Sequence, residues 1–212
     1  LDRWQRPYWL FALWGGMEKC QGDGLSRGCY LIPKDPKIAF IHCPTFSFES
    51  YQPEVLKNRG YYAYPPRALQ CLQVAIKSIP SRVIDLNFLL LDRLQTQEGN
   101  LYEMLLELLD EQIGDANVFG VSTGVIVPAL FDSDKHPFLE VLKHLHGKGL
   151  IMAGGACATI EARNLIEGRW ADLVFKGEAE DKLRYLFENG PPTAGIAYWD
   201  KGYRESEGSH EM

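Results

Sequence analysis

Apolar and polar positions along the chain form two alternating patterns from residue 37 onward. Short apolar runs with the length of buried strands lie at residues 37–43, 82–86, 117–122, 150–153 and 172–175. Between these runs, apolar residues recur three and four positions apart, as on one face of a helix, at about residues 65–79, 100–113, 138–145, 159–167 and 180–187. Strands that alternate with helices predict an α/β fold, with a parallel sheet covered by helices on both faces.

Five strands in this arrangement predict a doubly wound, Rossmann-like parallel sheet of the flavodoxin type, with strand order 2-1-3-4-5. We expect this domain to span residues 37–190. Residues 1–36 are aromatic-rich, and we expect an irregular extension that packs on the domain; a surface for docking a partner is the alternative. Residues 191–212 are expected to hold a two-stranded ribbon that acts as a linker, followed by a tail.

Composition narrows the class of protein. The chain has 212 residues, of which 46% are apolar, enough for one domain with a sizeable core. Its formal net charge is −6 and it has no basic patch, which argues against nucleic acid as a partner. No apolar run reaches the roughly 18 to 20 residues of a membrane-spanning helix, so we expect no membrane partner. Five cysteines without a Cys-x-x-Cys pair indicate free thiols, and hence a cytoplasmic protein.

Small and hydroxyl-bearing residues gather where the predicted strands end. Ser122 and Thr123 follow the third strand, Gly154 and Gly155 follow the fourth, and Gly177 follows the fifth. Ligands of such sheets bind at the carboxyl ends of the strands, where glycine allows close approach and hydroxyls can hydrogen-bond. Each loop alone is a common turn, but the three together favour a flat or elongated ligand.

Catalytic motifs are lacking. The sequence holds no nucleophile elbow, no zinc-protease motif and no phosphate-binding loop of the Walker type, so we expect no catalytic residue. His42 ends the first strand, but a lone histidine in an apolar run is more often a hydrogen-bonded core residue. We therefore assign no protein ligand to a metal.

Four short motifs occur in order on this framework. They are Tyr64-Pro65-Pro66 before the first helix, Val121-Ser122-Thr123 after the third strand, Gly154-Gly155-Ala156-Cys157-Ala158-Thr159 after the fourth, and Val174-Phe175-Lys176-Gly177-Glu178-Ala179-Glu180 after the fifth. With these motifs, residues 37 to 200 resemble the cobalamin-binding domain that precedes the catalytic barrel in cobalamin-dependent radical S-adenosylmethionine enzymes. The resemblance implies cobalamin as the cofactor. Its cobalt-bearing corrin ring would lie on the strand ends, and its dimethylbenzimidazole tail would lie between the sheet and a helix.

The resemblance also implies roles for single residues. The Ser122 hydroxyl would hydrogen-bond the tail, and Gly154 and Gly155 would make room for it. Gly177 and Glu178 would flank its ribose or base. The candidate cofactor-binding set is completed by residues of the same loops and of the loop after the first strand: Thr123, Gly124, Val125, Ala156, Cys157, Pro44 and Thr45. The aromatic loop at residues 42–64 would lie under or beside the corrin.

Three departures from the family pattern limit what this chain is expected to do alone. The Asp-x-His-x-x-Gly motif, whose histidine ligates cobalt in methionine synthase and the mutases, is absent, and the histidine of the Gly-Gly loop is Cys157 here. The Cys-x-x-x-Cys-x-x-Cys motif for an iron–sulfur cluster is absent too. We therefore expect the non-catalytic cobalamin module of a radical S-adenosylmethionine methyltransferase. Its catalytic domain, with S-adenosylmethionine and the cluster, would lie downstream or in another chain.

Two other functions fit the same elements. The first is a cofactor-free protein-interaction domain of the same fold, whose aromatic N-terminal segment docks a partner. The second is a flavodoxin-like flavin site, which would need a loop rich in Ser, Thr and Gly after the first strand. Residues 44–48 match such a loop poorly, so the flavin site ranks below the other two.

Overall fold

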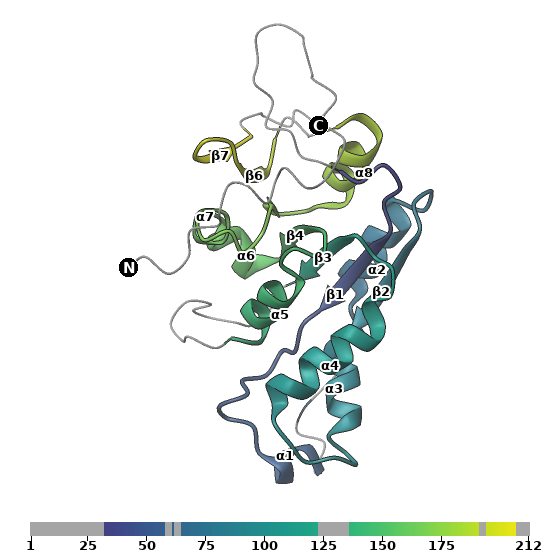
Figure 1. The fold of residues 1–212 in the computed structure, drawn as a ribbon, viewed down its shortest axis with the longest axis vertical. Helices are drawn as coiled ribbons and strands as arrows, with labels where there is room; N and C mark the ends of the chain where they lie inside the picture. The colour runs from purple at the N-terminus through teal and green to yellow at the C-terminus, as the bar shows by residue number, and fades with distance from the viewer. Residues whose placement is uncertain (1–31, 58–60, 62–64, 123–135, 191–193, 207–212) are drawn as a thin grey trace, which may run out of the picture.

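The structure is a computed structural model and describes residues 32–57, 61, 65–122, 136–190 and 194–206 (Figure 1). Its strands form one seven-stranded sheet in the order β2-β1-β3-β4-β5-β6-β7. The strands are β1 (Ile38–His42), β2 (Ser81–Asp85), β3 (Val118–Ser122), β4 (Leu150–Gly154), β5 (Leu173–Phe175), β6 (Ile196–Trp199) and β7 (Tyr203–Glu205). The first five run parallel, whereas β6 and β7 are antiparallel to their neighbours.

The predicted order 2-1-3-4-5 is confirmed for β1 to β5, but the prediction of a five-stranded, wholly parallel sheet is wrong. The expected ribbon exists, and β6 joins the sheet by pairing with β5, with Phe175 opposite Ile196. Without β6, β5 would be an edge strand with unpaired backbone groups. A short apolar run reads the same in a free ribbon as in an edge strand, which is why the sequence pattern did not distinguish them.

The helices are α1 (Pro53–Lys57), α2 (Arg67–Ala75), α3 (Leu86–Arg93), α4 (Leu101–Ile113), α5 (Pro137–Leu145), α6 (Ala156–Ile160), α7 (Ala162–Glu167) and α8 (Glu180–Asn189). Two of them, α1 and α3, are not predicted from the periodicity, and the helix expected at residues 159–167 is two short helices. The chain passes directly from β2 into α3 because the Asp85 carboxylate accepts a hydrogen bond from the Phe88 N–H at 3.0 Å. None of the described helices is both long and apolar enough to cross a bilayer.

The sheet has two faces, because successive residues of a strand point to opposite sides. On one face, which we call the closed face, Ile41, Phe119 and Ile151 belong to a buried core that also contains residues of α3 to α7. On the other, the open face, Ile38, Val118 and Met152 pack with residues of α2 and α8. Figure 1 shows α5, α6 and α7 grouped on one side of the strands and α8 on the other.

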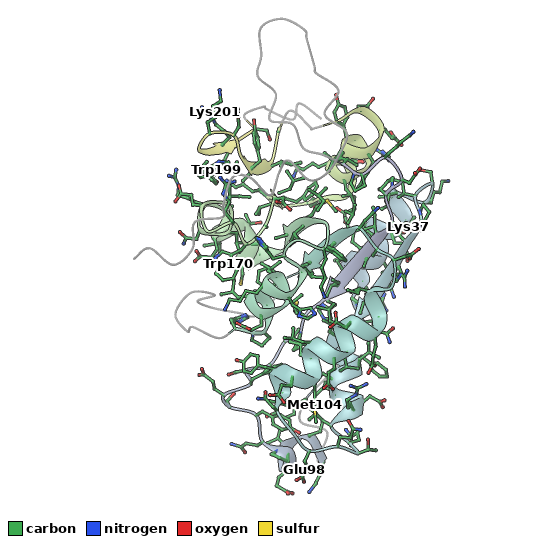
Figure 2. All side chains as sticks on the ribbon, in the orientation of Figure 1. Lys37, Glu98, Met104, Trp170, Trp199 and Lys201 are labelled. Atoms are coloured by element: carbon green, nitrogen blue, oxygen red, sulfur yellow. The ribbon has the colours of Figure 1, made fainter. Side chains whose placement is uncertain are left out.

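Three of the side chains labelled in Figure 2 help to orient the sheet: Trp170, Trp199 and Lys37. Trp170 and Trp199 lie on the side of α6 and α7, and both pack against the core of the closed face. Lys37, at the amino edge of the sheet, pairs with Asp115 at 2.5 Å, and Arg82 pairs with the same carboxylate at 3.0 Å. The opposite, carboxyl edge carries the glycine-rich loops.

Candidate ligand-binding pocket

A pocket of about 410 Å³ lies on the open face, between the sheet and helices α2 and α8. Its volume falls in the range of small-molecule sites, roughly 300–1,000 Å³. The strands contribute Phe40, Gly120, Met152 and Phe175, and the helices contribute Ala68, Leu69, Leu72 and Leu183, together with Ala179, the residue before α8. Among the described elements, α2 and α8 are the helices that cover this face, and the pocket lies between them and the sheet and opens at the carboxyl edge.

Strand register gives the depth of the pocket. Phe40 pairs with Gly120, and Gly120 pairs with Met152, so these three form one row across the open face. Two residues further along, Ser122 pairs with Gly154 at the carboxyl edge. Since a strand rises about 3.3 Å per residue, the pocket reaches roughly 7 Å inward from its mouth.

Gly120 shapes the deep end. A Cβ placed on Gly120 would lie 2.7 Å from Cδ1 of Phe40, so the Phe40 ring rests directly on the glycine backbone. Any larger residue at this position would push the ring into the pocket. The absence of a side chain at Gly120 thus keeps a flat aromatic surface on the floor.

Glycines also keep the mouth open. A Cβ placed on Gly154 or on Gly177 would meet no atom of the described residues within 4 Å, so these residues leave space next to both backbones. Gly155 and Gly177 have φ values of 103° and 70°, a backbone conformation that residues with a Cβ rarely adopt. The chain therefore turns sharply at both loops without a side chain obstructing the entrance.

Thr159 ties the two mouth loops together. Its hydroxyl donates a hydrogen bond to the Gly155 carbonyl at 3.0 Å and accepts one from the Gly177 N–H at 3.3 Å. Thr159 also lines the pocket. One side chain thus connects the loop after β4 to the loop after β5 and sets their spacing.

Lys182, in the first turn of α8, stabilises the loop after β5 through hydrogen bonds to its backbone. Its ammonium group donates hydrogen bonds to the carbonyls of Lys176 at 2.7 Å and Glu178 at 2.6 Å. Lys176 itself is paired with Glu205 at 2.7 Å. The described residues that line the pocket include two carboxylates, Glu178 and Glu180, and no lysine or arginine.

His42 lies next to the mouth without lining it. It is paired in register with Ser122 on one side and Asp85 on the other, and it is 8% exposed. Its Nε2 atom is buried with no hydrogen-bond partner. Burial lowers the pKa of His42, and the nearby Asp85 carboxylate opposes this shift. Burial therefore disfavours the charged form of this imidazole, and its Nε2 lacks a partner among the described residues.

The loop after β1 turns away from the pocket. The Thr45 N–H donates a hydrogen bond to Oδ1 of Asn87, a fully buried residue of α3, at 3.1 Å. Beyond it, aromatic rings contact one another: Phe46 and Tyr61 have ring centroids 5.0 Å apart, and Phe48 and Tyr102 are 4.8 Å apart. This loop therefore packs on α3 and α4, beside the closed face.

The comparisons with known proteins are sparse. No protein-family model and no curated protein matches the chain. Two solved structures of the cobalamin-dependent S-adenosylmethionine radical enzyme OxsB are similar, one with aqua-cobalamin and S-adenosylmethionine bound and one with aqua-cobalamin bound. They are 15% identical to this chain, with TM-scores of 0.49 and 0.47. Each match covers 82% of this chain and 22% of the OxsB chain, so this chain spans about a fifth of it. A likeness at this level carries no argument about ligand or activity.

The pocket brings together half of the residues that the sequence singles out. Those that line it are Ser122, Gly154, Gly155, Ala156, Gly177 and Glu178. Pro44 and Thr45 do not line it, and Cys157 packs instead against the core of the closed face. Thr123, Gly124 and Val125 lie outside the described residues.

Sequence reasoning missed the deep end of the pocket. Phe40, Gly120 and Met152 lie inside strands, where they read as ordinary core residues, and Leu72 lies on the apolar stripe of α2. Gly120 offered a signal, because a glycine inside a buried strand often marks a close approach of other groups. Among the described residues, no cluster of three or more His, Cys, Asp or Glu side chains is placed to hold a metal ion.

Proposed function

We propose that this chain binds cobalamin, with the nucleotide tail inserted in the pocket between the sheet and helices α2 and α8. The observation that carries this proposal is the pocket itself: an apolar slot that opens at the carboxyl edge of the sheet, between the loop at Gly154 and Gly155 and the loop at Gly177. The corrin ring would then lie on the carboxyl ends of the strands. The four motifs in sequence order support the same ligand.

The residues present fit a nucleotide tail. Apolar side chains at the deep end, such as Leu72 and Met152, suit the face of an aromatic ring. The hydroxyls of Ser122 and Thr159 lie at the mouth, where they can meet a ribose. The free space beside Gly154 leaves room for the chain of atoms that connects the ring to the corrin.

Charge at the pocket argues against a ligand that enters phosphate first. Basic side chains that pair with phosphate oxygens are a common feature of sites for phosphate-bearing ligands. Here the described lining residues carry the carboxylates of Glu178 and Glu180 and no basic group. A ligand whose inserted part is an uncharged ring fits this slot better than a flavin mononucleotide.

We assign the chain the role of a binding module. When bound, a methylated cobalamin is a source of a transferable methyl group. The residues of this chain would hold the cofactor and orient it toward a radical S-adenosylmethionine domain, in the same chain or another. S-adenosylmethionine, the iron–sulfur cluster and the methyltransferase reaction belong to that domain in this proposal.

Cobalamin binding is tested by titrating the 212-residue protein with hydroxocobalamin, followed by gel filtration. We expect a change in the visible spectrum and retention of about one cobalamin per chain. Gly154→Ala should weaken binding by about tenfold or more, because its methyl group enters space that the ligand needs. Gly202→Ala is the matched control, since its Cβ also meets nothing within 4 Å and Gly202 lies in the turn between β6 and β7.

Two outcomes would contradict the proposal. If the spectrum does not change and the protein leaves the column colourless, the cofactor-free interaction domain becomes the better explanation. If cobalamin binds but Gly154→Ala and Gly202→Ala both bind it as tightly as the parent protein, the ligand does not occupy this pocket. Circular dichroism of the two variants should match that of the parent.

A further inference from the structure

Polarity in the pocket is sorted by depth. The polar lining residues are Ser122, Thr159, Glu178 and Glu180. Ser122 ends β3, Glu178 lies in the loop after β5 and Glu180 begins α8, whereas Thr159 lies in α6 and bonds to the mouth loops at Gly155 and Gly177. The row two residues deeper, Phe40, Gly120 and Met152, carries no hydrogen-bonding side chain. A ligand that enters from the mouth therefore meets polar groups first and apolar groups last.

The two helices continue the same gradient. Helix α2 follows the loop at the carboxyl edge and leads to β2, which starts at the amino edge, so α2 runs inward from Ala68 to Leu72. Helix α8 likewise begins at the mouth, at Ala179 and Glu180, and places Leu183 one turn deeper. Each wall of the deep end is thus made of hydrocarbon.

We propose that the pocket selects cobamides by their lower base, accepting a benzimidazole and rejecting a purine. This inference rests on the proposed function. The far edge of dimethylbenzimidazole carries two methyl groups, which need no hydrogen bonds. The corresponding edge of adenine carries an amine and ring nitrogens, which would lose their water and find no partner among the side chains of the deep end.

The magnitude follows from the polar groups left without partners. Burying one polar group without a hydrogen bond weakens binding by about tenfold or more. We therefore expect the deep end to favour cobalamin over the cobamide whose lower base is adenine by at least about tenfold, apart from the difference in the free energy of detaching each base from cobalt. The affinity for cobinamide, which has no nucleotide tail, should not respond to a change in the deep end.

Leu72 provides the variant that tests the cause. Leu72→Gln places an amide of similar size in the deep end, where it can pair with the edge of adenine. Val74→Gln is the matched control, since it makes an equally polar change on α2 at a residue that is 71% exposed and does not line the pocket.

The experiment measures dissociation constants for cobalamin, the adenine cobamide and cobinamide, all in the aqua or hydroxo form, by spectroscopic titration of the 212-residue protein. The readout is the ratio of the adenine-cobamide constant to the cobalamin constant. Comparing this ratio between variants cancels the free energy needed to detach each base from cobalt in solution. We expect the ratio to fall at least about threefold in Leu72→Gln and to stay unchanged in Val74→Gln.

Each outcome decides something. A ratio that Leu72→Gln leaves unchanged would overturn the selectivity while cobalamin binding stands. If Leu72→Gln changes the affinities for cobinamide and cobalamin by the same factor, the tail is outside the pocket, which would overturn the selectivity as well. If none of the three corrinoids binds, the proposed function itself fails.

Discussion

The same strands build the closed and the open face of the sheet, but the two faces are packed differently. On the closed face, Phe119, Val121 and Ala153 are at most 1% exposed and belong to a core that reaches into α3 to α7. On the open face, the next positions along the same strands are Gly120, Ser122 and Gly154, and a pocket of about 410 Å³ lies above them. One face is filled by its own side chains, whereas the other leaves space that a ligand can fill.

This contrast separates stability from function within one sheet. Close packing of a buried face contributes hydrophobic free energy, roughly 25 cal/mol for each Å² of apolar surface removed from water. The small residues on the open face bury less apolar surface, so they contribute less of this hydrophobic free energy. Along β3, the larger Phe119 and Val121 therefore help to hold the fold on the closed face, whereas the small Gly120 and Ser122 leave space for a ligand on the open face.

The largest expected effect tests the packing of the two faces directly. Leu142→Ala, on the closed face at 0% exposure, should lower the free energy of unfolding by about 2–5 kcal/mol. Leu72→Ala, on the open face, should cost less than about 2 kcal/mol, because its side chain borders the pocket and is only partly buried. Urea unfolding of both variants measures the difference; equal losses would contradict the division between the faces.

A second test compares two glycines of the open face. Gly120→Ala should cost about 1–3 kcal/mol, because its Cβ would lie 2.7 Å from the Phe40 ring and must displace it. Gly154→Ala should stay within about 1 kcal/mol of the parent protein in either direction, since its Cβ meets nothing within 4 Å. Thermal unfolding without ligand measures both. A larger loss of stability in Gly154→Ala than in Gly120→Ala would show that the mouth has no room for a methyl group.

Thr159 offers a smaller and more local test of how the mouth is held. Thr159→Val removes the hydroxyl between Gly155 and Gly177 at nearly constant shape, and should cost about 0.5–1.5 kcal/mol. Thr159→Ser keeps the hydroxyl and is expected to behave more like the parent protein. Hydrogen exchange of the Gly177 amide is the sharper measurement, because it should speed up in the valine variant alone. Unchanged exchange would mean that Thr159 does not couple the loops.

The smallest expected effect is a pH dependence with one histidine on each side of the sheet. Burial lowers the pKa of His42 on the open face and of His136, which caps α5 on the closed face. Below the unfolded pKa, near 6.5, the unfolded chain binds protons that the folded chain does not. The stability should therefore be full above about pH 6.5 and should fall as the pH drops through that value toward the folded pKa.

Replacing either histidine should flatten this part of the stability curve. His42→Leu removes a group whose Nε2 has no partner, and His136→Asn keeps a side chain that can cap α5. Urea unfolding at pH 7 and pH 5 gives the comparison, with His146→Gln as an exposed control. A parent protein equally stable at both pH values would refute the assignment.

Much of the fold was predictable from local patterns. The strands β1 to β5 and helices α2, α4, α5 and α8 follow from the apolar pattern of short segments, and the strand order follows from the doubly wound fold that such an alternation fits. Helix α3 was missed because its first residue, Leu86, extends the apolar run of β2, and only the Asp85 cap shows where the strand stops. The addition of β6 and β7 to the sheet was not predictable in this way, because it depends on which parallel strand is left at the edge.

The candidate site was predictable only at its rim. Ser122, Gly154 and Gly177 lie where strands end, a place that the general behaviour of α/β sheets marks for ligands. The sequence reasoning also placed Thr45 there, but its backbone N–H bonds to Asn87 and the loop turns toward α3 instead. Such a turn depends on a partner 42 residues away and leaves no local trace.

By itself, the sequence determined the class of fold and the edge of the sheet that bears the glycine loops. These are properties of short segments, set by periodicity and turn residues. The pocket was decided only in three dimensions, because its walls come from β1, β3, β4, β5, α2 and α8, which strand register and helix packing bring together. Its apolar depth exists because Gly120 stands beside Phe40, two residues 80 positions apart in the chain that meet only in the sheet.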